Sequence, residues 1–260
     1  MNRRRFIAFT GAALASSLVG STWERSLEHT RSSLNIKAIV FDAFPIFNPS
    51  PVFVLADQLF PGRGSALSEE WRARQFEYAW LRIAAHHYAD FWQITHDALV
   101  FAANKLQLEL TADKREALMN AYLKLTVWPE VPAALNRIKA LGLQMAFLSN
   151  FTQRMLDANI KYAGLEKLFD HVISTDQVRT YKPDPLAYQL GIDVLGLKRE
   201  EIMFAAFAGW DAAGAKLFGY PTFWVNRLKL PAEELDAVPD ASGGSLLDLI
   251  QFLQTHAASA

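Results

Sequence analysis

The second half of the chain alternates short apolar runs with segments whose apolar residues repeat at helical spacing. The apolar runs have the length and the flanking turn residues of buried strands, and they lie at residues 143–148, 169–174, 202–206 and 222–225. The other segments predict helices at residues 132–140, 152–163, 186–195, 212–218 and 246–253. Strands that alternate with helices indicate βαβ units, and therefore a parallel sheet with helices on both faces.

The first half of the chain has a different pattern. An apolar run at residues 36–41 predicts one more buried strand, which ends at Asp42 and precedes a turn-forming stretch. Residues 49–128 lack strand signals and predict helices. Residues 62–105 are expected to be helical, and a second helix is expected to begin within them and run from 88 to 105. A third helix is expected from an N-cap signal at Thr111 to about Thr126.

Together the two patterns predict an α/β fold with an insertion. The expected architecture is a Rossmann-like parallel-sheet core with an inserted helical cap subdomain. The core takes residues 34–48 and 129–260, and the cap takes residues 49–128.

Residues 1–33 predict a targeting segment that precedes the fold. Arg3-Arg4-Arg5-Phe6-Ile7 begins an apolar run from Phe6 to Gly20, which is short for a membrane span. The segment resembles a twin-arginine export signal. We therefore expect a periplasmic protein with no stable membrane span after processing. A basic tail on a cytoplasmic enzyme and a retained anchor are the alternatives.

Composition excludes several classes of function. The chain has 260 residues and a net charge of -1, so it lacks the basic excess of a nucleic-acid-binding protein. It has no cysteine, which excludes disulfides, thiolate catalysis and cysteine-ligated metals. None of its six histidines forms an i, i+4 pair of the zinc-site kind. No metal site and no cofactor are predicted.

Polar residues with useful chemistry follow the predicted strands. Asp42, Ser149-Asn150, Lys182 and Asp211 lie at the strand ends or in the loops beyond them. Parallel strands place these ends at one edge of the sheet, so the four positions are expected to converge on one pocket. Taken singly, Asp42 could merely end a strand and Lys182 could be an ordinary turn lysine. Their shared order and spacing favour a functional site.

This order resembles the haloacid dehalogenase superfamily, and within it the L-2-haloacid dehalogenases. The resemblance spans about residues 36–227 and extends beyond the strand ends. It includes Phe60-Pro61-Gly62-Arg63-Gly64, Trp71-Arg72, Glu77 to Arg82, Leu148-Ser149-Asn150, Tyr181-Lys182-Pro183-Asp184 and Trp210 to Ala215.

The resemblance implies a two-step hydrolysis of a small-molecule (S)-2-haloacid to an (R)-2-hydroxyacid. Asp42 would displace the halide and become an ester, and water would then hydrolyse that ester at the Asp42 carbonyl. Lys182 would keep Asp42 ionised by opposite-charge attraction, as a carboxylate nucleophile requires. Asp211 would prepare the water. The resemblance also implies a homodimer.

The remaining expected site residues bind the substrate. Ser149 and the backbone amides after Asp42, at Ala43 and Phe44, would hold the substrate carboxylate. Arg72 would bind the substrate carboxylate or the leaving halide. Asn150 and Trp210 would help cradle the halide, and Tyr188 would steady Lys182 and Asp211. Three of these side chains also have a structural interpretation: Arg72 as a solvated charge, Trp210 as core packing and Tyr188 as a core residue with a satisfied hydroxyl.

Several positions depart from the family pattern. Phe44-Pro45-Ile46-Phe47 stands where tyrosine, glycine, threonine and leucine are usual. Ala206, Ala208 and Phe151 replace a serine, an asparagine and a glycine. We expect these changes to make one pocket more apolar. An alternative is therefore a protein of the same fold that binds a small acid or stalls at the ester. A phosphatase is disfavoured, because Phe44 stands where phosphatases carry a second aspartate.

Overall fold

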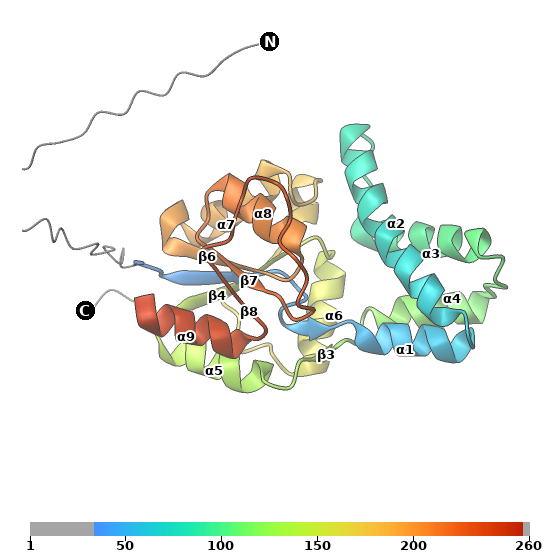
Figure 1. The fold of residues 1–260 in the computed structure, drawn as a ribbon, viewed down its shortest axis with the longest axis horizontal. Coiled ribbons are helices and arrows are strands. Elements are labelled where there is room, and N and C mark those ends of the chain that lie inside the picture. Colours follow the sequence, from blue (N-terminus) through green and yellow to red (C-terminus); the bar gives the residue numbers. More distant parts are fainter. Residues whose placement is uncertain (1–33, 257–260) are drawn as a thin grey trace, which may run out of the picture. The chain divides into compact units, whose positions relative to one another are not determined.

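The computed structural model describes residues 34–256 (Figure 1). The export signal predicted at residues 1–33 lies outside the described residues. Among the described helices, none combines the length and hydrophobicity that a membrane span needs.

The core is a six-stranded sheet in which every neighbouring pair is parallel, in the order β5-β4-β1-β6-β7-β8. The predicted fold class is therefore confirmed. The strands are β1 (Ala38–Phe41), β4 (Gln144–Ser149), β5 (His171–Ser174), β6 (Ile202–Ala206), β7 (Thr222–Val225) and β8 (Ala241–Gly243). The edge strand β8 was not predicted, because Ser242-Gly243-Gly244-Ser245 carries no strand pattern.

The chain direction across the sheet reverses at β1. The chain moves outward from β1 through β4 and β5, and then returns to the other side of β1 as β6, β7 and β8. Phe41, the last residue of β1, pairs with Phe147 of β4 and Ala205 of β6. Ligand crevices of open α/β sheets form at such a reversal, outside the carboxyl ends of the strands. The topology thus places Asp42 at the centre of that edge.

Helices cover both faces of the sheet because successive strand residues point to opposite sides. Ile39 and Phe41 belong to one buried cluster, and Val40 belongs to another. The first cluster includes α5 (Val131–Ala140), α6 (Gln153–Ala163) and α9 (Leu246–His256). The second includes α7 (Pro185–Leu195) and α8 (Gly209–Phe218). Short 3₁₀ turns, η1 (Thr175–Val178) and η2 (Arg199–Glu201), precede α7 and β6.

The segment between β1 and α5 is mainly helical, as its pattern predicted. It contains α1 (Ser50–Leu59), α2 (Gly64–Ala84), α3 (Phe91–Lys105) and α4 (Ala112–Ala121). Helix α1 was missed because its prolines suggest a turn, although Pro51 lies in the first helical turn, where proline is tolerated.

The two ends of this helical segment form a short strand pair that was not expected. β2 (Phe47–Asn48) and β3 (Thr126–Val127) run antiparallel, and two-residue strands are too short to show alternation. The third predicted helix therefore ends at Ala121, earlier than the expected position near Thr126.

Helix α8 begins at Gly209, three residues before the predicted start at Ala212. Its N-cap residue, Ala208, has no side chain that could bind the free amides, so the usual sequence signal of a helix start is missing. Asp211 therefore lies in the first turn of a helix and not in a loop. The partial positive charge of a helix N-terminus favours a carboxylate at this position.

Gly214 sets the approach of α8 to α7. A Cβ atom at this position would lie 2.6 Å from the Tyr188 hydroxyl and 2.7 Å from the Pro183 Cβ, closer than real contacts allow. We expect Gly214→Ala to lower the free energy of unfolding by about 1–3 kcal/mol through overpacking. Gly244→Ala is the control, because its Cβ would meet nothing within 4 Å. Denaturant unfolding of both variants measures the difference, and equal stabilities would contradict the packing interpretation.

Candidate active site

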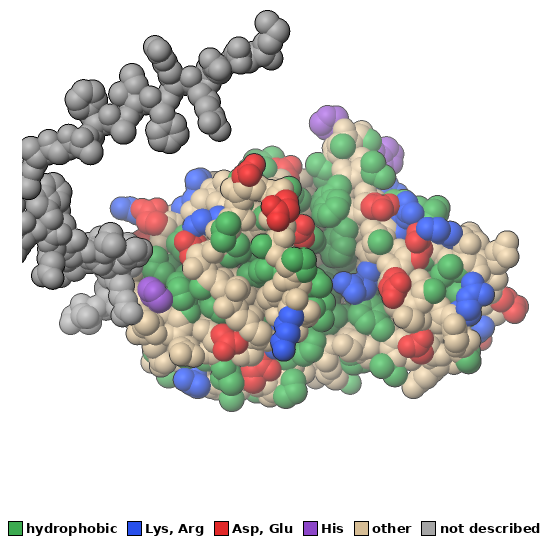
Figure 2. All heavy atoms as spheres, viewed as in Figure 1, with side chains coloured by type: hydrophobic (Ala, Val, Ile, Leu, Met, Phe, Trp, Pro, Cys, Tyr) green, Lys and Arg blue, Asp and Glu red, His purple; other side chains and the backbone are tan. Residues whose placement is uncertain are grey.

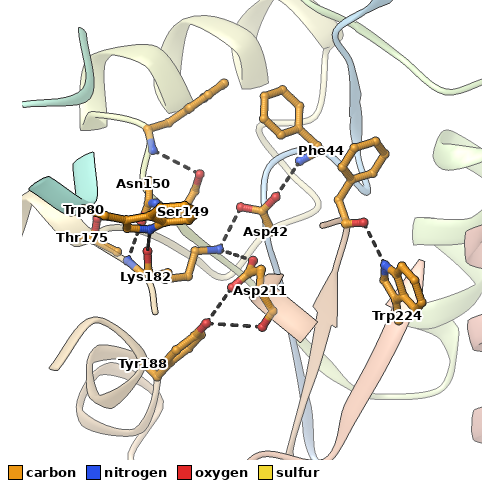
Figure 3. Close-up of polar contacts among 12 residues, drawn as sticks. Asp42, Phe44, Trp80, Ser149, Asn150, Thr175, Lys182, Tyr188, Asp211 and Trp224 are labelled. Carbon is orange, nitrogen blue, oxygen red and sulfur yellow. Dashed lines mark hydrogen bonds and ion pairs between the residues drawn. The ribbon is translucent and has the colours of Figure 1, made fainter. Parts of the chain in front are cut away.

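The predicted strand-end residues meet at one edge of the sheet (Figure 3). Asp42 follows β1 directly, and Ser149 is the last residue of β4, with Asn150 next to it. Lys182 lies between η1 and α7, and Asp211 lies in α8 after β6. The parallel sheet brings these residues together although up to 169 positions separate them, from Asp42 to Asp211.

Lys182 joins the two carboxylates. Its Nζ donates to Asp42 Oδ1 over 2.8 Å and to Asp211 Oδ2 over 2.7 Å (Figure 3). The lysine side chain is 1% exposed. Burial alone would lower the pKa of Lys182, but the charges of Asp211 and Asp42 outweigh it and raise that pKa above its usual value. Lys182 therefore stays a cation and stabilises both anions.

Asp211 is a buried carboxylate with a raised pKa. Its burial raises its pKa from the usual 3.8 to about 6; the Lys182 ammonium opposes this rise, and the Asp42 charge adds to it. The Tyr188 hydroxyl donates to Asp211 Oδ1 over 2.8 Å. Burial, followed by the negative charge of Asp211, raises the pKa of Tyr188 well above its usual value, so the hydroxyl remains a donor. Asp211 is thus a buried base near neutral pH.

Asn150 is fixed through its side-chain oxygen. Oδ1 accepts the backbone N–H of Lys182 over 3.0 Å and the hydroxyl of Thr175 over 3.3 Å. Since the oxygen is engaged, the NH₂ group is the part of the amide that is left to bind a ligand. Sequence reasoning missed Thr175, which directly follows β5; the rule that identified the other strand-end residues would have found it.

Trp80 is a second residue that the sequence reasoning did not assign to the site. Its indole N–H donates to the backbone carbonyl of Lys182 over 3.3 Å, from α2 across to the sheet edge. Its ring also packs edge-on against Trp210, with 5.5 Å between centroids. Trp80 lies inside a stretch that resembles the family, which was the available signal.

A cleft of about 730 Å³ opens in front of Asp42, between the sheet edge and the first helices of the insertion (Figure 2). Six of the predicted site residues line it: Asp42, Phe44, Arg72, Ser149, Asn150 and Trp210. The other four are buried and do not line it: Ala43, Lys182, Tyr188 and Asp211. The cleft is mostly apolar, with walls that include Phe53, Phe76, Phe91 and Trp128.

Arg72 is the cation of this cleft that the sequence singled out. It lies on the exposed side of α2, and its guanidinium is 5.4 Å from the centre of the Phe53 ring. Within residues 34–256 it forms no ion pair with a carboxylate. Its charge and five N–H donors are therefore available to an anion in the cleft.

The family departures do not all fall in one pocket, contrary to the prediction. Phe151 and Ala208 line the cleft. Ile46 and Ala206 are fully buried in hydrophobic clusters, where an apolar side chain is the favourable choice. Of the seven changed positions, three therefore form part of the wall of the cleft: Phe44, Phe151 and Ala208.

The comparisons with known proteins show the family of this chain. A family model described as haloacid dehalogenase-like hydrolase matches residues 58–219. The chain is 42% identical to an (S)-2-haloacid dehalogenase from Pseudomonas sp. (strain YL), over 86% of this chain and 97% of that protein. The chain belongs to the (S)-2-haloacid dehalogenases, within the haloacid dehalogenase-like hydrolases.

Solved structures of this family have the same fold. An L-2-haloacid dehalogenase structure matches with a TM-score of 0.83 and 43% identity, over 85% of this chain and 99% of that chain. The enzyme from Xanthobacter autotrophicus, solved with chloropropionic acid covalently bound, matches with a TM-score of 0.79 and 33% identity, over 84% of this chain and 98% of that chain.

Asp211 generates a prediction about stability and pH. Its pKa is about 6 in the folded protein, against 3.8 ordinarily, so between these values the folded state binds more protons than the unfolded state. The contribution of Asp211 to stability therefore falls as pH rises from about 4 to about 6. We expect the stability of wild type relative to Asp211→Asn to decline over this window and to level off above it. Chemical denaturation across this pH range measures the difference, and a rise would contradict the prediction.

Proposed function

We propose that this protein hydrolyses (S)-2-haloacids to (R)-2-hydroxyacids through an ester on Asp42. The observation that carries the proposal is the Asp42 carboxylate, which faces the cleft while Lys182 binds its Oδ1 at 2.8 Å. A paired lysine keeps a carboxylate ionised, and an ionised carboxylate is what attack on a carbon requires. Family membership supports the same reaction.

In the first step, an Asp42 oxygen attacks C2 of the substrate from the side opposite the halogen. The new C–O bond forms as the carbon–halogen bond breaks, and the halide leaves with the bonding electrons. Attack from the opposite side inverts the configuration at C2. The Phe44 amide donates to Asp42 Oδ2 over 3.3 Å and so orients the nucleophile.

In the second step, water adds to the Asp42 carbonyl carbon. The bond from that carbon to the ester oxygen then breaks, which releases the hydroxyacid and restores the Asp42 carboxylate. Asp211 takes one proton of the water, for which its raised pKa of about 6 is suited, and later loses it to solvent. The proton that remains on the added hydroxyl passes to the departing alkoxide oxygen of the hydroxyacid. Lys182 and Tyr188 hold the two oxygens of Asp211, at 2.7 and 2.8 Å.

The cleft walls supply the binding groups for a 2-haloacid. Ser149, together with the amides of Ala43 and Phe44, would bind the substrate carboxylate beside Asp42. Arg72, Trp210 and the NH₂ group of Asn150 would surround the halide. Their placement supports these roles, since Ser149, Asn150, Arg72 and Trp210 all line the same cleft as Asp42.

Residues 49–128 would act as a cap over the core of residues 34–48 and 129–260. Arg72, Phe76 and Trp80 of α2 line the cleft opposite residues of the sheet edge. A cap that closes on the substrate would exclude water from the first step, in which water competes for the substrate.

The central test is halide release from (S)-2-chloropropionate without added metal. We expect release by wild type and none by Asp42→Asn, because an amide cannot act as the nucleophile. After brief exposure to substrate, mass spectrometry should detect the added mass of the ester on the Asp42 peptide of wild type, and no added mass on that of Asp42→Asn. Ester that accumulates without sustained release would indicate a stalled enzyme, and release by Asp42→Asn would overturn the proposed nucleophile. Magnesium-dependent phosphate release would indicate a phosphatase.

For residues 1–33 we propose twin-arginine export to the periplasm. The support is the sequence Arg3-Arg4-Arg5-Phe6-Ile7 followed by a short apolar run. Changing Arg3, Arg4 and Arg5 together to lysine should retain the full-length chain in the cytoplasm, as measured by cell fractionation and immunoblotting. The control is Arg25→Lys, which leaves the paired arginines intact and should be exported. Equal export of both variants would contradict the signal.

A homodimer is also proposed, on the resemblance to the family. Sedimentation velocity on the purified protein distinguishes a dimer from a monomer.

A further inference from the structure

The loop after Asp42 begins with a tight turn. The Ala43 carbonyl accepts the amides of Ile46 over 3.2 Å and Phe47 over 2.8 Å. The same peptide group carries the Phe44 amide at its other end, and a planar peptide unit has its N–H and C=O on opposite sides. The turn therefore directs the Phe44 amide toward Asp42, where it meets Oδ2 at 3.3 Å.

The next three carbonyls of the loop bind groups from two distant segments. The Phe44 carbonyl accepts the indole N–H of Trp128 over 2.9 Å, and the Ile46 carbonyl accepts the backbone N–H of Trp128 over 3.2 Å. Between them, the Pro45 carbonyl accepts Nη2 of Arg227 over 2.9 Å. Four consecutive carbonyls, from residues 43 to 46, are thus engaged by the protein.

Trp128 and Arg227 also hold each other in place. The Arg227 guanidinium lies 4.5 Å from the centre of the Trp128 ring, and its Nη2 pairs with Glu130 Oε1 at 2.6 Å. The arginine side chain is 7% exposed. The Trp128 ring also stacks on Phe207 at 6.4 Å between centroids, and the Phe207 and Phe44 rings lie 5.8 Å apart.

The loop of residues 43–47 needs hydrogen-bond donors from other segments, because it contains a proline and lacks a hydroxyl side chain. Pro45 has no amide hydrogen, so the Phe44–Pro45 peptide presents only its carbonyl, which needs a donor. Ile46 has no hydroxyl with which to bind the nucleophile. A carbonyl turned toward the cleft would repel both the Asp42 carboxylate and an anionic substrate, whereas an amide stabilises them.

We propose that Trp128 and Arg227 are positioning residues, which bind the carbonyls of Phe44, Pro45 and Ile46 and so keep the amide side of this loop facing Asp42 and the substrate. The effect on rate rests on the proposed function. The effect on the loop itself does not depend on it.

Trp128→Phe is the decisive variant, because it removes the indole N–H and keeps an aromatic ring. A displacement of about 1 Å can slow a positioned reaction about 100-fold, and we expect ester formation in a single turnover to slow about 10-fold. The fraction of chains that form ester should stay at the wild-type level. Hydrogen exchange of peptides covering residues 43–48 should become faster.

Arg227 offers a graded pair of variants. Nη2 of Arg227 makes both bonds, to Glu130 and to the Pro45 carbonyl, so a lysine ammonium can retain part of this contact. Lysine lacks the planar guanidinium that lies against the Trp128 ring. Arg227→Met removes both bonds. We expect the single-turnover rate to fall from wild type to Arg227→Lys to Arg227→Met, with loop exchange rising in the same order. If Arg227→Met does not fold, Trp128→Phe and Arg227→Lys decide the question.

Trp71→Phe is the matched control. Like Trp128, Trp71 donates its indole N–H to a backbone carbonyl, that of Thr95 at 2.7 Å, but it is fully buried and does not line the cleft, whereas Trp128 is half-buried. It should lose stability while its single-turnover rate and loop exchange remain those of wild type.

The outcomes separate positioning from mere structural support. If Trp128→Phe lowers the thermal midpoint as Trp71→Phe does, but keeps the wild-type rate and loop exchange, the proposal is overturned. If wild type forms no ester with any short 2-haloacid, the proposed function fails instead, and loop exchange alone decides. Faster exchange in Trp128→Phe then supports the inference, and unchanged exchange overturns it.

Discussion

The site depends on one buried cation that two carboxylates share. Lys182 donates to Asp42 and Asp211 while almost fully removed from water. A buried ammonium is tolerated only when paired, and removing one partner of such a pair commonly costs about 3–5 kcal/mol. The end of β1, the segment before α7 and the first turn of α8 must therefore meet correctly. The sheet order and the close approach of α7 to α8 at Gly214 bring these three segments together.

The buried charged groups of the site lie on one side of Asp42, and the apolar groups line the cleft on its other side. Lys182, Asp211 and Tyr188 lie buried beyond Asp42, whereas the cleft in front of Asp42 is walled mainly by aromatic side chains. In a cleft of low polarity, electrostatic interactions with a bound anion are stronger than in water. An anion bound in this cleft would therefore interact with Arg72 more strongly than it would in bulk water.

Much of the site follows from a simple rule about parallel strands. Asp42, Ser149 and Asn150 lie at strand ends, so the strand assignments alone placed them at one edge. The rule extends to Thr175, which was overlooked because its role is to bind Asn150 and not to line the cleft. It could not identify Trp80 or Trp128, since their indoles reach the site from segments without strand signals. Arg227 was missed for another reason: it reaches the loop after Asp42 through the Pro45 carbonyl, and a backbone carbonyl leaves no mark in the side-chain pattern.

The sequence by itself determined the α/β class, the order of the core elements and the residues that converge after the strands, because periodicity and turn residues are local properties. Only the tertiary structure decided which substitutions face the cleft, since burial of Ile46 and Ala206 depends on helices distant in sequence. It likewise decided that Asp211 sits in a helical turn and that the proline-containing loop after Asp42 is held from outside. These features arise from long-range packing and hydrogen bonds, which no local pattern records.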